Sequence, residues 1–264
     1  MFYKYHGCGN DFIIAEYADG IDYGKLTQKI CNRYVGVGAD TFIVIKKGEF
    51  YGVDFYNADG TLAPMCGNGI RCAAQFLKDM KYVEGNEINI ETMTGLRKVY
   101  YNDNGIMINM GSVSYDKNLL DLDYDGDQIF DYNYLYKGIE YNLNAIFLTT
   151  HHLVIPVEDL NISDEVADYF CKNKMIKKMI NVDFVKIVDR KNILVKTYER
   201  GVGWTKACGS GTTSSVAVLN KKGLVDDEVK AEFEYGYLII SRKGDDYYMT
   251  GPAKLVASDI KFYE

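Results

Sequence analysis

The sequence lacks the features that mark several common classes of protein. No apolar run approaches the roughly 20 residues that a membrane span needs, and the first residues, MFYKYHGCGNDF, do not look like a signal peptide. The six cysteines include no C-x-x-C pair, which argues against a zinc cluster. We therefore expect a cytoplasmic protein whose cysteines are thiols, with no bound metal and no membrane partner.

Basic residues are too few for a nucleic-acid binder. Lys and Arg number 30 against 37 Asp and Glu, so the formal net charge at pH 7 is −7. This excess of negative charge argues against a nucleic acid or an anionic membrane as the main partner. Hydrophobic residues make up 47% and charged residues 25%, as in a soluble globular protein, and 264 residues allow one large domain or two of ordinary size.

Two short segments, far apart in the chain, have nearly the same pattern. PMCGNGIRCAAQFL begins at Pro64, and KACGSGTTSSVAVL begins at Lys206. In each segment a cysteine precedes Gly-x-Gly, and apolar residues at helical spacing follow. The pattern predicts one helix after Cys66 and another after Cys208, with each cysteine at the helix N-terminus.

The two cysteines are 142 residues apart, and other residues match at the same offset. The matched pairs include Asn10 with His152, Phe42 with Phe184, Asn57 with Glu199, Gly67 with Gly209, and Leu77 with Leu219. The offset holds from residue 10 to residue 77 without a net insertion, which indicates an ancient duplication. The chain is therefore expected to contain two similar halves.

Strand-like and helix-like segments are distributed similarly in the two halves. Runs such as DTFIVIKK and DFVKIVD alternate apolar and polar residues or are rich in β-branched and aromatic residues. A second helix is expected in each half, at 23–31 and at 163–178. Many strands with few helices predict an α+β fold of two domains, 1–114 and 115–251, and residues 252–264 are expected to return to the first as an extra strand.

The paired cysteines suit one kind of reaction. A thiol at a helix N-terminus lies at the positive end of the helix dipole, which favours its thiolate, and the Gly-x-Gly backbone N–H groups suit a carboxylate. With Cys66 and Cys208 on opposite sides of an amino acid, one thiolate removes the α-proton while the other thiol protonates the opposite face. Both helix N-termini stabilise the charge that builds on the carboxylate. The hypothesis is an amino-acid racemase or epimerase.

Other roles for the cysteines fit less well. Each segment carries a single cysteine, so a thiol–disulfide function has no redox pair. The four remaining cysteines are interpreted as small core residues, although Cys8 lies beside GND and is a candidate to line the site. An amino-acid-binding module without turnover is a further alternative, which two thiols disfavour because binding alone does not require them.

Three segments of the sequence resemble the diaminopimelate epimerase family, whose members isomerise amino acids without pyridoxal phosphate. YHGCGNDFII is similar to its opening motif, NADGTLAPMCGNGIRC to its first cysteine block, and ERGVGWTKACGSGTTS to its second. The resemblance covers nearly the whole chain. It implies two pseudo-symmetric domains, each a curled, barrel-like antiparallel sheet around a central helix, with the active site in the cleft between them and no cofactor.

The resemblance also implies roles for particular residues. Cys66 and Cys208 match the acid–base pair, and His152 and Glu199 match residues that hold the reacting amine or tune the thiols. The residues that match substrate-binding positions are Asn10 in the opening motif, Gly67, Asn68, Gly209 and Ser210 in the carboxylate-binding turns, and Asn57, Asn181 and Arg200 at the far end of diaminopimelate.

Several positions depart from the family pattern. The family usually has GNPH where this chain has Thr149–His152, so Thr150 replaces an asparagine that binds the distal end of the substrate. Thr41 stands where Gly or Gln is usual, and Trp204 adds a large ring near the second cysteine. A shorter hydroxyl in place of an amide holds a charged distal group less well. These departures favour a histidine racemase, with diaminopimelate epimerase as the alternative; a small-molecule amino acid is the expected partner, and a homodimer would be unsurprising.

Overall fold

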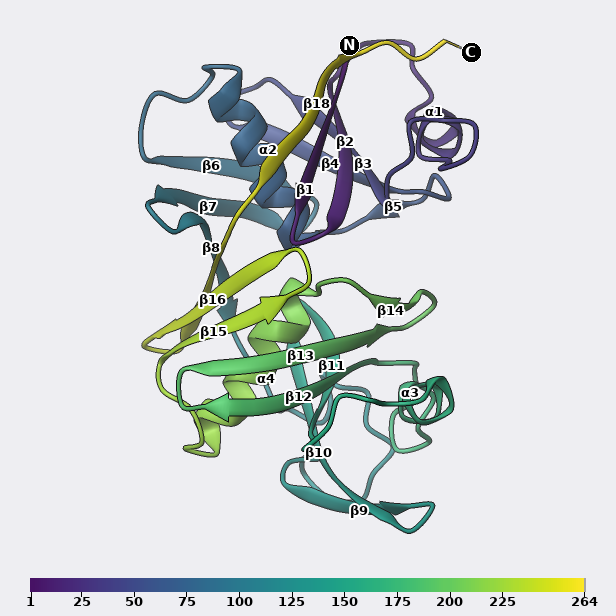
Figure 1. The fold of residues 1–264 in the computed structure, drawn as a ribbon, viewed down its shortest axis with the longest axis vertical. Helices are drawn as coiled ribbons and strands as arrows, with labels where there is room; N and C mark the ends of the chain where they lie inside the picture. The colour runs from purple at the N-terminus through teal and green to yellow at the C-terminus, as the bar shows by residue number, and fades with distance from the viewer. Residues whose placement is uncertain (264) are drawn as a thin grey trace. The chain divides into compact units, whose positions relative to one another are not determined.

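The computed structural model describes residues 1–263, which form two compact units. Unit 1 contains Met1–Asn109 and the described residues from Thr250 onward, and unit 2 contains Met110–Met249. Figure 1 shows the elements of each unit, and they are described here one unit at a time.

The strands of unit 1 form one hydrogen-bonded sheet of hairpins, which crossovers containing helices join. Its elements are β1 (Phe2–Gly7), β2 (Asn10–Glu16), α1 (Tyr23–Ile30), β3 (Thr41–Lys46), β4 (Tyr51–Asn57), β5 (Leu62–Ala63), α2 (Gly67–Asp79), β6 (Glu87–Thr92), β7 (Gly95–Asn102), β8 (Gly105–Ser112), which runs on into unit 2, and β18 (Lys254–Ile260). Hydrogen bonding joins the strands in the order β8, β7, β6, β4, β3, β2, β1, β18, with β5 also on β4.

Unit 2 repeats this order of elements. After an additional strand, β9 (Tyr132–Tyr136), it contains β10 (Ile139–Leu148), β11 (Thr150–Pro156), α3 (Asp164–Cys171), β12 (Asn181–Asp189), β13 (Asn192–Glu199), β14 (Gly203–Thr205), α4 (Gly209–Lys221), β15 (Glu228–Phe233), β16 (Gly236–Lys243) and β17 (Asp246–Gly251), which runs on into unit 1. The helices α2 and α4 have 13 residues each and begin 142 positions apart, so the offset found in the sequence describes the structure. The duplication and the α+β fold are confirmed.

The sheets are mixed, whereas the family resemblance implies antiparallel ones. The pairs β2–β3 and β4–β6 in unit 1 are parallel, as are β11–β12 and β13–β15 in unit 2. The hairpins β1–β2, β3–β4, β6–β7, β7–β8, β10–β11, β12–β13 and β15–β16 are antiparallel. Each parallel pair is joined by a connection that contains a helix, because a chain must cross over before it can re-enter a sheet in the same direction.

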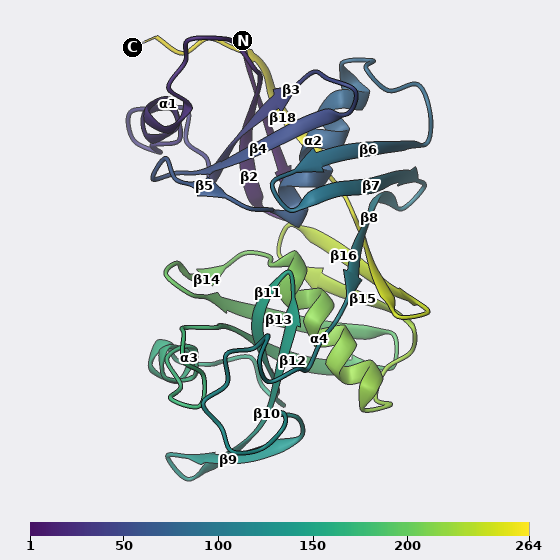
Figure 2. The ribbon, with the colours of Figure 1, turned by 180° about the vertical axis from the view of Figure 1, so that it is seen from behind.

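The longer helix of each unit is wrapped by strands of the same unit (Figure 2). Helix α2 contacts β1, β2, β3, β4, β6 and β18, and helix α4 contacts β10, β11, β12, β13 and β16. The apolar face predicted for the first helix is buried, with Ile70, Ala73, Ala74 and Leu77 all without solvent exposure. Burial on nearly all sides fixes the helix N-terminus, and with it the cysteine, relative to the surrounding strand ends.

One predicted helix is shorter than expected. The sequence predicts a helix over 163–178, but α3 ends at Cys171. Asn173 explains the stop, because its side-chain oxygen accepts a hydrogen bond from the backbone N–H of Met175 and so forms a local turn in place of another helical turn. Ile176 then pairs with Leu122 through an isolated β-bridge.

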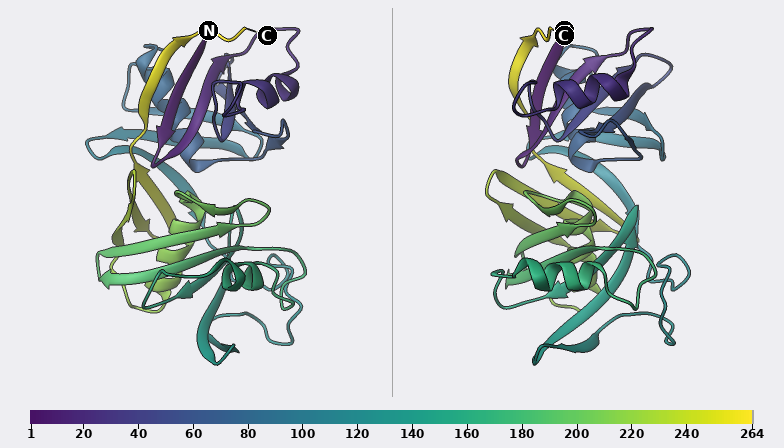
Figure 3. Two further views of the ribbon diagram at one scale, coloured as in Figure 1. Left: turned by 45° about the vertical axis from the view of Figure 1, so that its right-hand side comes forward. Right: turned by 90° about the vertical axis from the view of Figure 1, so that its right-hand side faces the viewer.

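The last strand returns to unit 1. Strand β18 pairs antiparallel with β1, which itself pairs with β2 on its other edge. Figure 3 shows the yellow C-terminal strand beside the purple first strand in both views. The two ends of the chain therefore lie in one sheet, and unit 2 is inserted between them in the sequence.

Candidate active site

Both cysteines of the repeated segments are helix N-caps, as the sequence predicts. Cys66 precedes α2 and Cys208 precedes α4, and both have extended backbone dihedrals. Each sulfur accepts a hydrogen bond at 3.4 Å from the third residue on, the N–H of Gly69 or of Gly211. A cap is usually supplied by Ser, Thr, Asp or Asn. A sulfur in that place is exposed to the positive end of the helix dipole, which stabilises its anion.

In unit 1 the amide of Asn10 faces the first cysteine. The Asn10 side-chain oxygen accepts a hydrogen bond from the Asn68 amide at 3.3 Å and lies 3.8 Å from the Cys66 sulfur. Asn10 begins β2, and Asn68 lies in the first turn of α2. These three predicted site residues therefore lie together, with Gly67 between Cys66 and Asn68 in the same turn.

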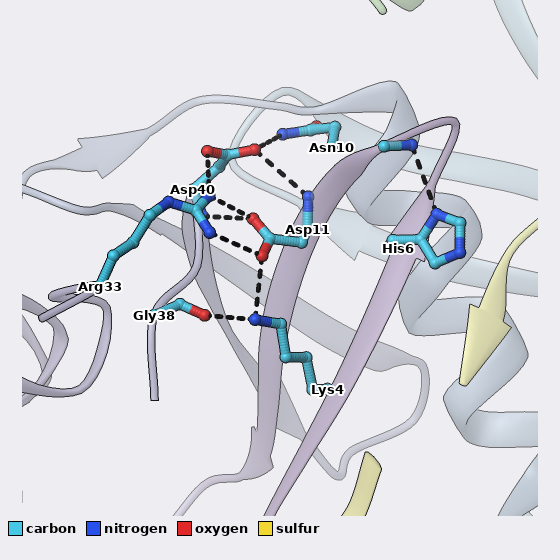
Figure 4. Close-up of polar contacts among 8 residues, drawn as sticks. Lys4, His6, Asn10, Asp11, Arg33, Gly38 and Asp40 are labelled. Carbon is cyan, nitrogen blue, oxygen red and sulfur yellow. Dashed lines mark hydrogen bonds and ion pairs between the residues drawn. The ribbon is translucent and has the colours of Figure 1, made fainter. Parts of the chain in front are cut away.

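An ion-pair network behind Asn10 sets the orientation of its amide (Figure 4). The Asn10 nitrogen donates to Asp40 at 2.8 Å, so the oxygen is left to face Asn68 and Cys66. Arg33 binds both Asp40 and Asp11, and Lys4 binds Asp11. Burial acts to raise the pKa of Asp11, but hydrogen bonds from Arg33 and Lys4 lower it overall. Asp40 is a positioning residue that the sequence reading missed.

A buried arginine lies beneath the first cysteine turn. Arg71 has no solvent exposure and donates to the Asn68 side-chain oxygen at 2.9 Å. Burial lowers the pKa of its guanidinium, and the nearby thiols of Cys8, Cys72 and Cys66 oppose that shift. An anion at Cys66 is therefore close to a cation in a medium of low dielectric. Arg71 belongs to the GNGIRC motif, and its place one helical turn after Asn68 is the signal that identifies it.

Thr41 and Asn57 lie opposite each other in unit 1. They are register partners on β3 and β4. Thr41 is buried, while Asn57 is exposed and its amide donates to the Thr61 hydroxyl at 3.1 Å. The binding roles of Thr41 and Asn57 stay predictions.

In unit 2 the second cysteine is more deeply buried. Cys208 is 7% exposed, whereas Cys66 has intermediate exposure. Burial raises the pKa of the Cys208 thiol well above its usual range, and the negative charges of Glu199 and Asp183 raise it further. Hydrogen bonds from Ser210 and from the Gly211 N–H act in the opposite direction. Burial and the two carboxylates therefore favour the thiol form of Cys208.

A chain of hydrogen bonds leads from Cys208 to a buried carboxylate. The Cys208 sulfur lies 3.4 Å from the Ser210 hydroxyl, and that hydroxyl lies 3.0 Å from Nε2 of His152. Nδ1 of His152 lies 2.7 Å from Asp183 Oδ2, and Asp183 Oδ1 accepts from Thr197 at 2.7 Å. His152 and Asp183 have no solvent exposure. Asp183 was not a candidate site residue. Thr41, which matches it in unit 1 at the 142-residue offset, was one.

Glu199 lies near the same cysteine, at the end of β13. Its carboxylate accepts a hydrogen bond from the Thr205 hydroxyl at 2.9 Å, and its charge acts on Cys208 as described above. Gly209 lies directly after the cysteine and is buried in the first turn of α4. The structure thus places Glu199, His152, Gly209 and Ser210 in one group with Cys208.

Three further candidates form a separate cluster of unit 2. The backbone N–H of Arg200 donates to the Asn181 side-chain oxygen at 3.1 Å, and Nη2 of Arg200 donates to the Thr150 hydroxyl at 3.2 Å. Asn181 is also the register partner of His152 across the parallel β11–β12 pair. The cluster therefore lies one strand away from the imidazole, and its exposed guanidinium is suited to a carboxylate.

Trp204 has a structural role. Its indole N–H donates to Asp164 at 2.7 Å, at the N-terminus of α3, and its ring packs edge-to-face with Tyr198 and at a tilt against Phe184. These contacts attach β14 to α3. Cys8 lies in the β1–β2 turn with a φ of 55°, a conformation that few non-glycine residues adopt, and the turn brings it close to Arg71. All six cysteines are thiols.

Neither metal ligation nor membrane insertion is visible in the described chain. Among residues 1–263, no group of three or more His, Cys, Asp or Glu side chains is arranged to hold a metal ion. Within the same residues, no helix combines the length and the apolar character that crossing a membrane requires.

Comparison with known proteins places this geometry in a family context. The chain matches the family model described as "Diaminopimelate epimerase" over residues 2–115 and 145–256. It is 33% identical over 265 residues to the diaminopimelate epimerase of Caldanaerobacter subterraneus subsp. tengcongensis, with 97% of each chain covered.

Solved structures with low sequence identity share the fold. A PhzF-family phenazine biosynthesis protein of Bacillus anthracis superposes with a TM-score of 0.69 at 15% identity, over 97% of this chain and 96% of that one. A hydroxyproline epimerase of Agrobacterium vitis, solved with trans-4-hydroxy-L-proline bound, superposes with a TM-score of 0.68 at 12% identity, over 97% and 90% of the two chains.

Proposed function

We propose that the substrate of this protein is diaminopimelate. The chain belongs to the diaminopimelate epimerase family, and it is an isomerase of the amino-acid racemase and epimerase class. The observation that carries this proposal is the similarity to proteins named diaminopimelate epimerase, about one third identical over almost the full length of both chains. The sequence reading favours histidine because of Thr150, but the relatives give that preference no support. The proposed reaction converts the L,L-isomer to the meso-isomer.

The distal end of diaminopimelate carries a second carboxylate, and Arg200 is the group proposed to bind it. Thr150 replaces the usual asparagine, but its hydroxyl accepts a hydrogen bond from the same guanidinium. Asn181 holds the Arg200 backbone. Nη1 of Arg200 also donates to the Met179 carbonyl at 3.5 Å, a long hydrogen bond that a ligand carboxylate is proposed to replace. A planar fork suits bidentate binding of a carboxylate, which a histidine substrate does not offer at that end.

The reacting end is proposed to lie between the two cysteine turns, in a cleft that the two units form around the substrate. The α-carboxylate would accept hydrogen bonds from the first turns of α2 and α4, which begin with Gly67 and Gly209. One cysteine, as the thiolate, removes the α-proton, and the other, as the thiol, delivers a proton to the opposite face. Charge on the carboxylate is stabilised by both helix N-termini. No cofactor takes part in this mechanism.

His152 and Glu199 are proposed to serve the reacting centre from unit 2. Glu199, a carboxylate near Cys208, is suited to bind the α-ammonium group, because opposite charges attract strongly where water is excluded. His152 acts on the thiol side through Ser210. Asn10 is proposed to act for unit 1 with its oxygen toward Cys66.

The proposal also covers the location and the oligomeric state of the protein. We place the enzyme in the cytoplasm, as a homodimer whose subunits each carry both cysteines. Light scattering on the purified protein tests the dimer, and a monomer mass at working concentration would contradict it.

The substrate is tested by α-proton exchange in D₂O, followed by NMR, with L,L-diaminopimelate and L-histidine in parallel. Exchange with inversion is expected for diaminopimelate alone. The Arg200→Met variant is expected to raise the KM for diaminopimelate about tenfold or more, because a hydrogen-bonded charge contact is worth roughly 1.5–3 kcal/mol. Arg190→Met, which changes a surface arginine paired with Asp226, is the matched control and should behave as wild type. Exchange on histidine alone would overturn the proposed substrate.

A further inference from the structure

The hydrogen bonds around Cys208 end in a group that takes no part in the mechanism above. Asp183 is fully buried, and the ionisable group that it contacts is the imidazole of His152 at 2.7 Å. A buried carboxylate costs several kcal/mol unless it is well paired. Here it accepts hydrogen bonds from His152 and Thr197 and lies against the N-terminal turn of α4, whose dipole favours a negative charge.

The space for this carboxylate depends on a glycine. A Cβ atom built on Gly211 would lie 2.0 Å from Asp183 Oδ1, far inside van der Waals contact. Because residue 211 is glycine, the Asp183 carboxylate can lie against the first turn of α4 while it is hydrogen-bonded to His152. The equivalent Gly69 in unit 1 faces the ring of Phe55 instead, at 2.6 Å from a built Cβ. The carboxylate is thus a feature of unit 2 alone.

We propose that Asp183 is a positioning residue that sets His152 to exchange a proton with Cys208 through the Ser210 hydroxyl. The inference deepens the proposed function and rests on it for its catalytic consequence. With Asp183 accepting from Nδ1–H, Nε2 of His152 carries the lone pair and accepts from Ser210, and the Ser210 oxygen accepts from the Cys208 thiol.

The proton transfer balances within these four residues. The Cys208 S–H proton moves to the Ser210 oxygen while the Ser210 hydroxyl proton moves to Nε2 of His152. One S–H and one O–H bond break, and one O–H and one N–H bond form. The products are a thiolate and an imidazolium paired with the Asp183 carboxylate. Both states keep every hydrogen bond of the chain: the bonds between Cys208 and Ser210 and between Ser210 and His152 reverse direction, and Nδ1–H of His152 donates to Asp183 throughout. Cys208 can therefore serve as acid or base without leaving a buried polar group unpaired.

The duplication offers an internal comparison for this relay. The residues of unit 1 that match His152, Ser210 and Asp183 at the 142-residue offset are Asn10, Asn68 and Thr41. None of these three side chains titrates near neutral pH, so unit 1 has no equivalent relay. Cys66 instead lies near the permanent charge of Arg71. The relay therefore serves the cysteine whose burial and acidic neighbours oppose ionisation.

The first test is the tautomer of His152 in the wild-type protein, read from ¹⁵N chemical shifts after histidine labelling. Only three histidines are present, so assignment is direct. The expected result is a neutral ring protonated on Nδ1. A neutral ring protonated on Nε2 would overturn the proposal. This measurement needs neither a substrate nor a variant, so it stands even where the proposed function fails or Asp183→Asn does not fold.

The second test compares Asp183→Asn with Asp189→Asn, a change of an exposed aspartate on the same strand. By analogy with the triad aspartate of serine proteases, kcat for α-proton exchange on L,L-diaminopimelate should fall about 10²–10⁴-fold in Asp183→Asn. KM should change less than about threefold, since no substrate contact is lost. Asp189→Asn should match wild type. A kcat for Asp183→Asn within about threefold of wild type would overturn the proposal.

A substrate-free readout separates this proposal from the proposed function. Alkylation of Cys208 by iodoacetamide, measured by mass spectrometry in a Cys66→Ser background, reports its thiolate. Ser210→Ala should slow it about tenfold, the effect of 1.4 kcal/mol. Asp183→Asn removes a charge that raises the pKa of the Cys208 thiol and also the acceptor that orients His152. The relay predicts that the loss of the acceptor outweighs the loss of the charge, so that alkylation again slows about tenfold. Because the two residues act in series, the double variant should be no slower than either single variant. Additive effects, or none, would overturn the relay, whereas inactivity of wild type on diaminopimelate would count only against the proposed function.

Discussion

The two cysteine turns have the same backbone and opposite buried charges. Both begin a 13-residue helix with a cysteine N-cap whose sulfur accepts from the third residue at 3.4 Å. Beneath the first turn lies the guanidinium of Arg71, where the duplication puts Thr213 in unit 2. Behind the second lies the carboxylate of Asp183, where unit 1 has Thr41. The backbone was duplicated, and the electrostatics then diverged.

This difference distinguishes two thiols that the sequence leaves interchangeable. A cation near Cys66 stabilises an anion there, whereas burial and two acidic neighbours keep the proton on Cys208. A two-base reaction needs one thiolate and one thiol at the start of each turnover. Under the proposed mechanism, the unlike charges favour a starting state with Cys66 as the base and Cys208 as the acid.

The largest expected effect comes from removing either thiol. Cys66→Ser and Cys208→Ser should each reduce α-proton exchange about 10³-fold or more, because a serine hydroxyl is far less acidic and general acid–base catalysis typically contributes 10²–10⁴. Exchange in D₂O measures the loss. Cys171→Ser, at a buried thiol in α3, is the control and should retain activity. Normal turnover in both site variants would disprove the two-thiol mechanism.

The glycines test what lies behind each turn. Gly211→Ala should lower the free energy of unfolding by about 2–4 kcal/mol, since a methyl group would collide with a buried carboxylate that cannot move without losing its partners. Gly69→Ala should cost less, about 1–3 kcal/mol, because the Phe55 ring can shift. Urea denaturation of both variants gives the comparison, with Gly85→Ala, where a Cβ has room, as the control. If both alanine variants lost the same unfolding free energy, the buried Asp183 carboxylate would not make the second turn less tolerant of a methyl group than the first.

Thiol reactivity tests the assignment of base and acid. At pH 7.5, iodoacetamide should modify Cys66 at least about tenfold faster than Cys208, because the thiolate is the reactive form and Cys208 holds its proton. Arg71→Met should slow modification of Cys66 and leave that of Cys208 unchanged, while Lys98→Met, a change of an exposed cation, should alter neither. Peptide mapping gives both rates in one sample. Faster modification of Cys208 would reverse the assignment.

The smallest expected effect is on the pH dependence of stability. The folded-state pKa of Cys208 is raised, whereas an unfolded thiol titrates near 8.5, so the folded protein keeps a proton that the unfolded chain releases. Its contribution is complete below about pH 8.5 and falls as the pH rises above that value. Between pH 8 and 9.5, Cys208→Ser should therefore lose about 1 kcal/mol less unfolding free energy than wild type in urea titrations. Parallel curves for the two proteins would contradict the raised pKa.

Much of the fold can be predicted from this sequence, because the duplication leaves a constant offset. The cysteine turns, the two long helices and the mixture of many strands with few helices all follow from local patterns. The parallel strand pairs do not, because the direction of a strand depends on which neighbour it finds after a crossover. The early end of α3 depends on one side-chain hydrogen bond of Asn173, which helical periodicity does not reveal.

The sequence predicts the polar residues next to the cysteines better than it predicts the buried charged groups behind them, Asp183 and Arg71. Asn10, His152 and Ser210 lie in quoted motifs, and the structure places each beside its cysteine. Asp183 and Arg71 lie in runs that read as an apolar strand and a helix. Their importance follows from complete burial, which the sequence pattern of charged residues does not predict.

The position of β18 has a consequence for folding during synthesis on the ribosome. Strand β1 is made first, but the partner of one of its edges is made last. At 5–20 residues per second, synthesis of 110–249 takes on the order of ten seconds. During that interval the edge of β1 is open to pairing with other nascent chains. The inserted unit is contiguous and can fold as it emerges, so the domain encoded first is the one completed last.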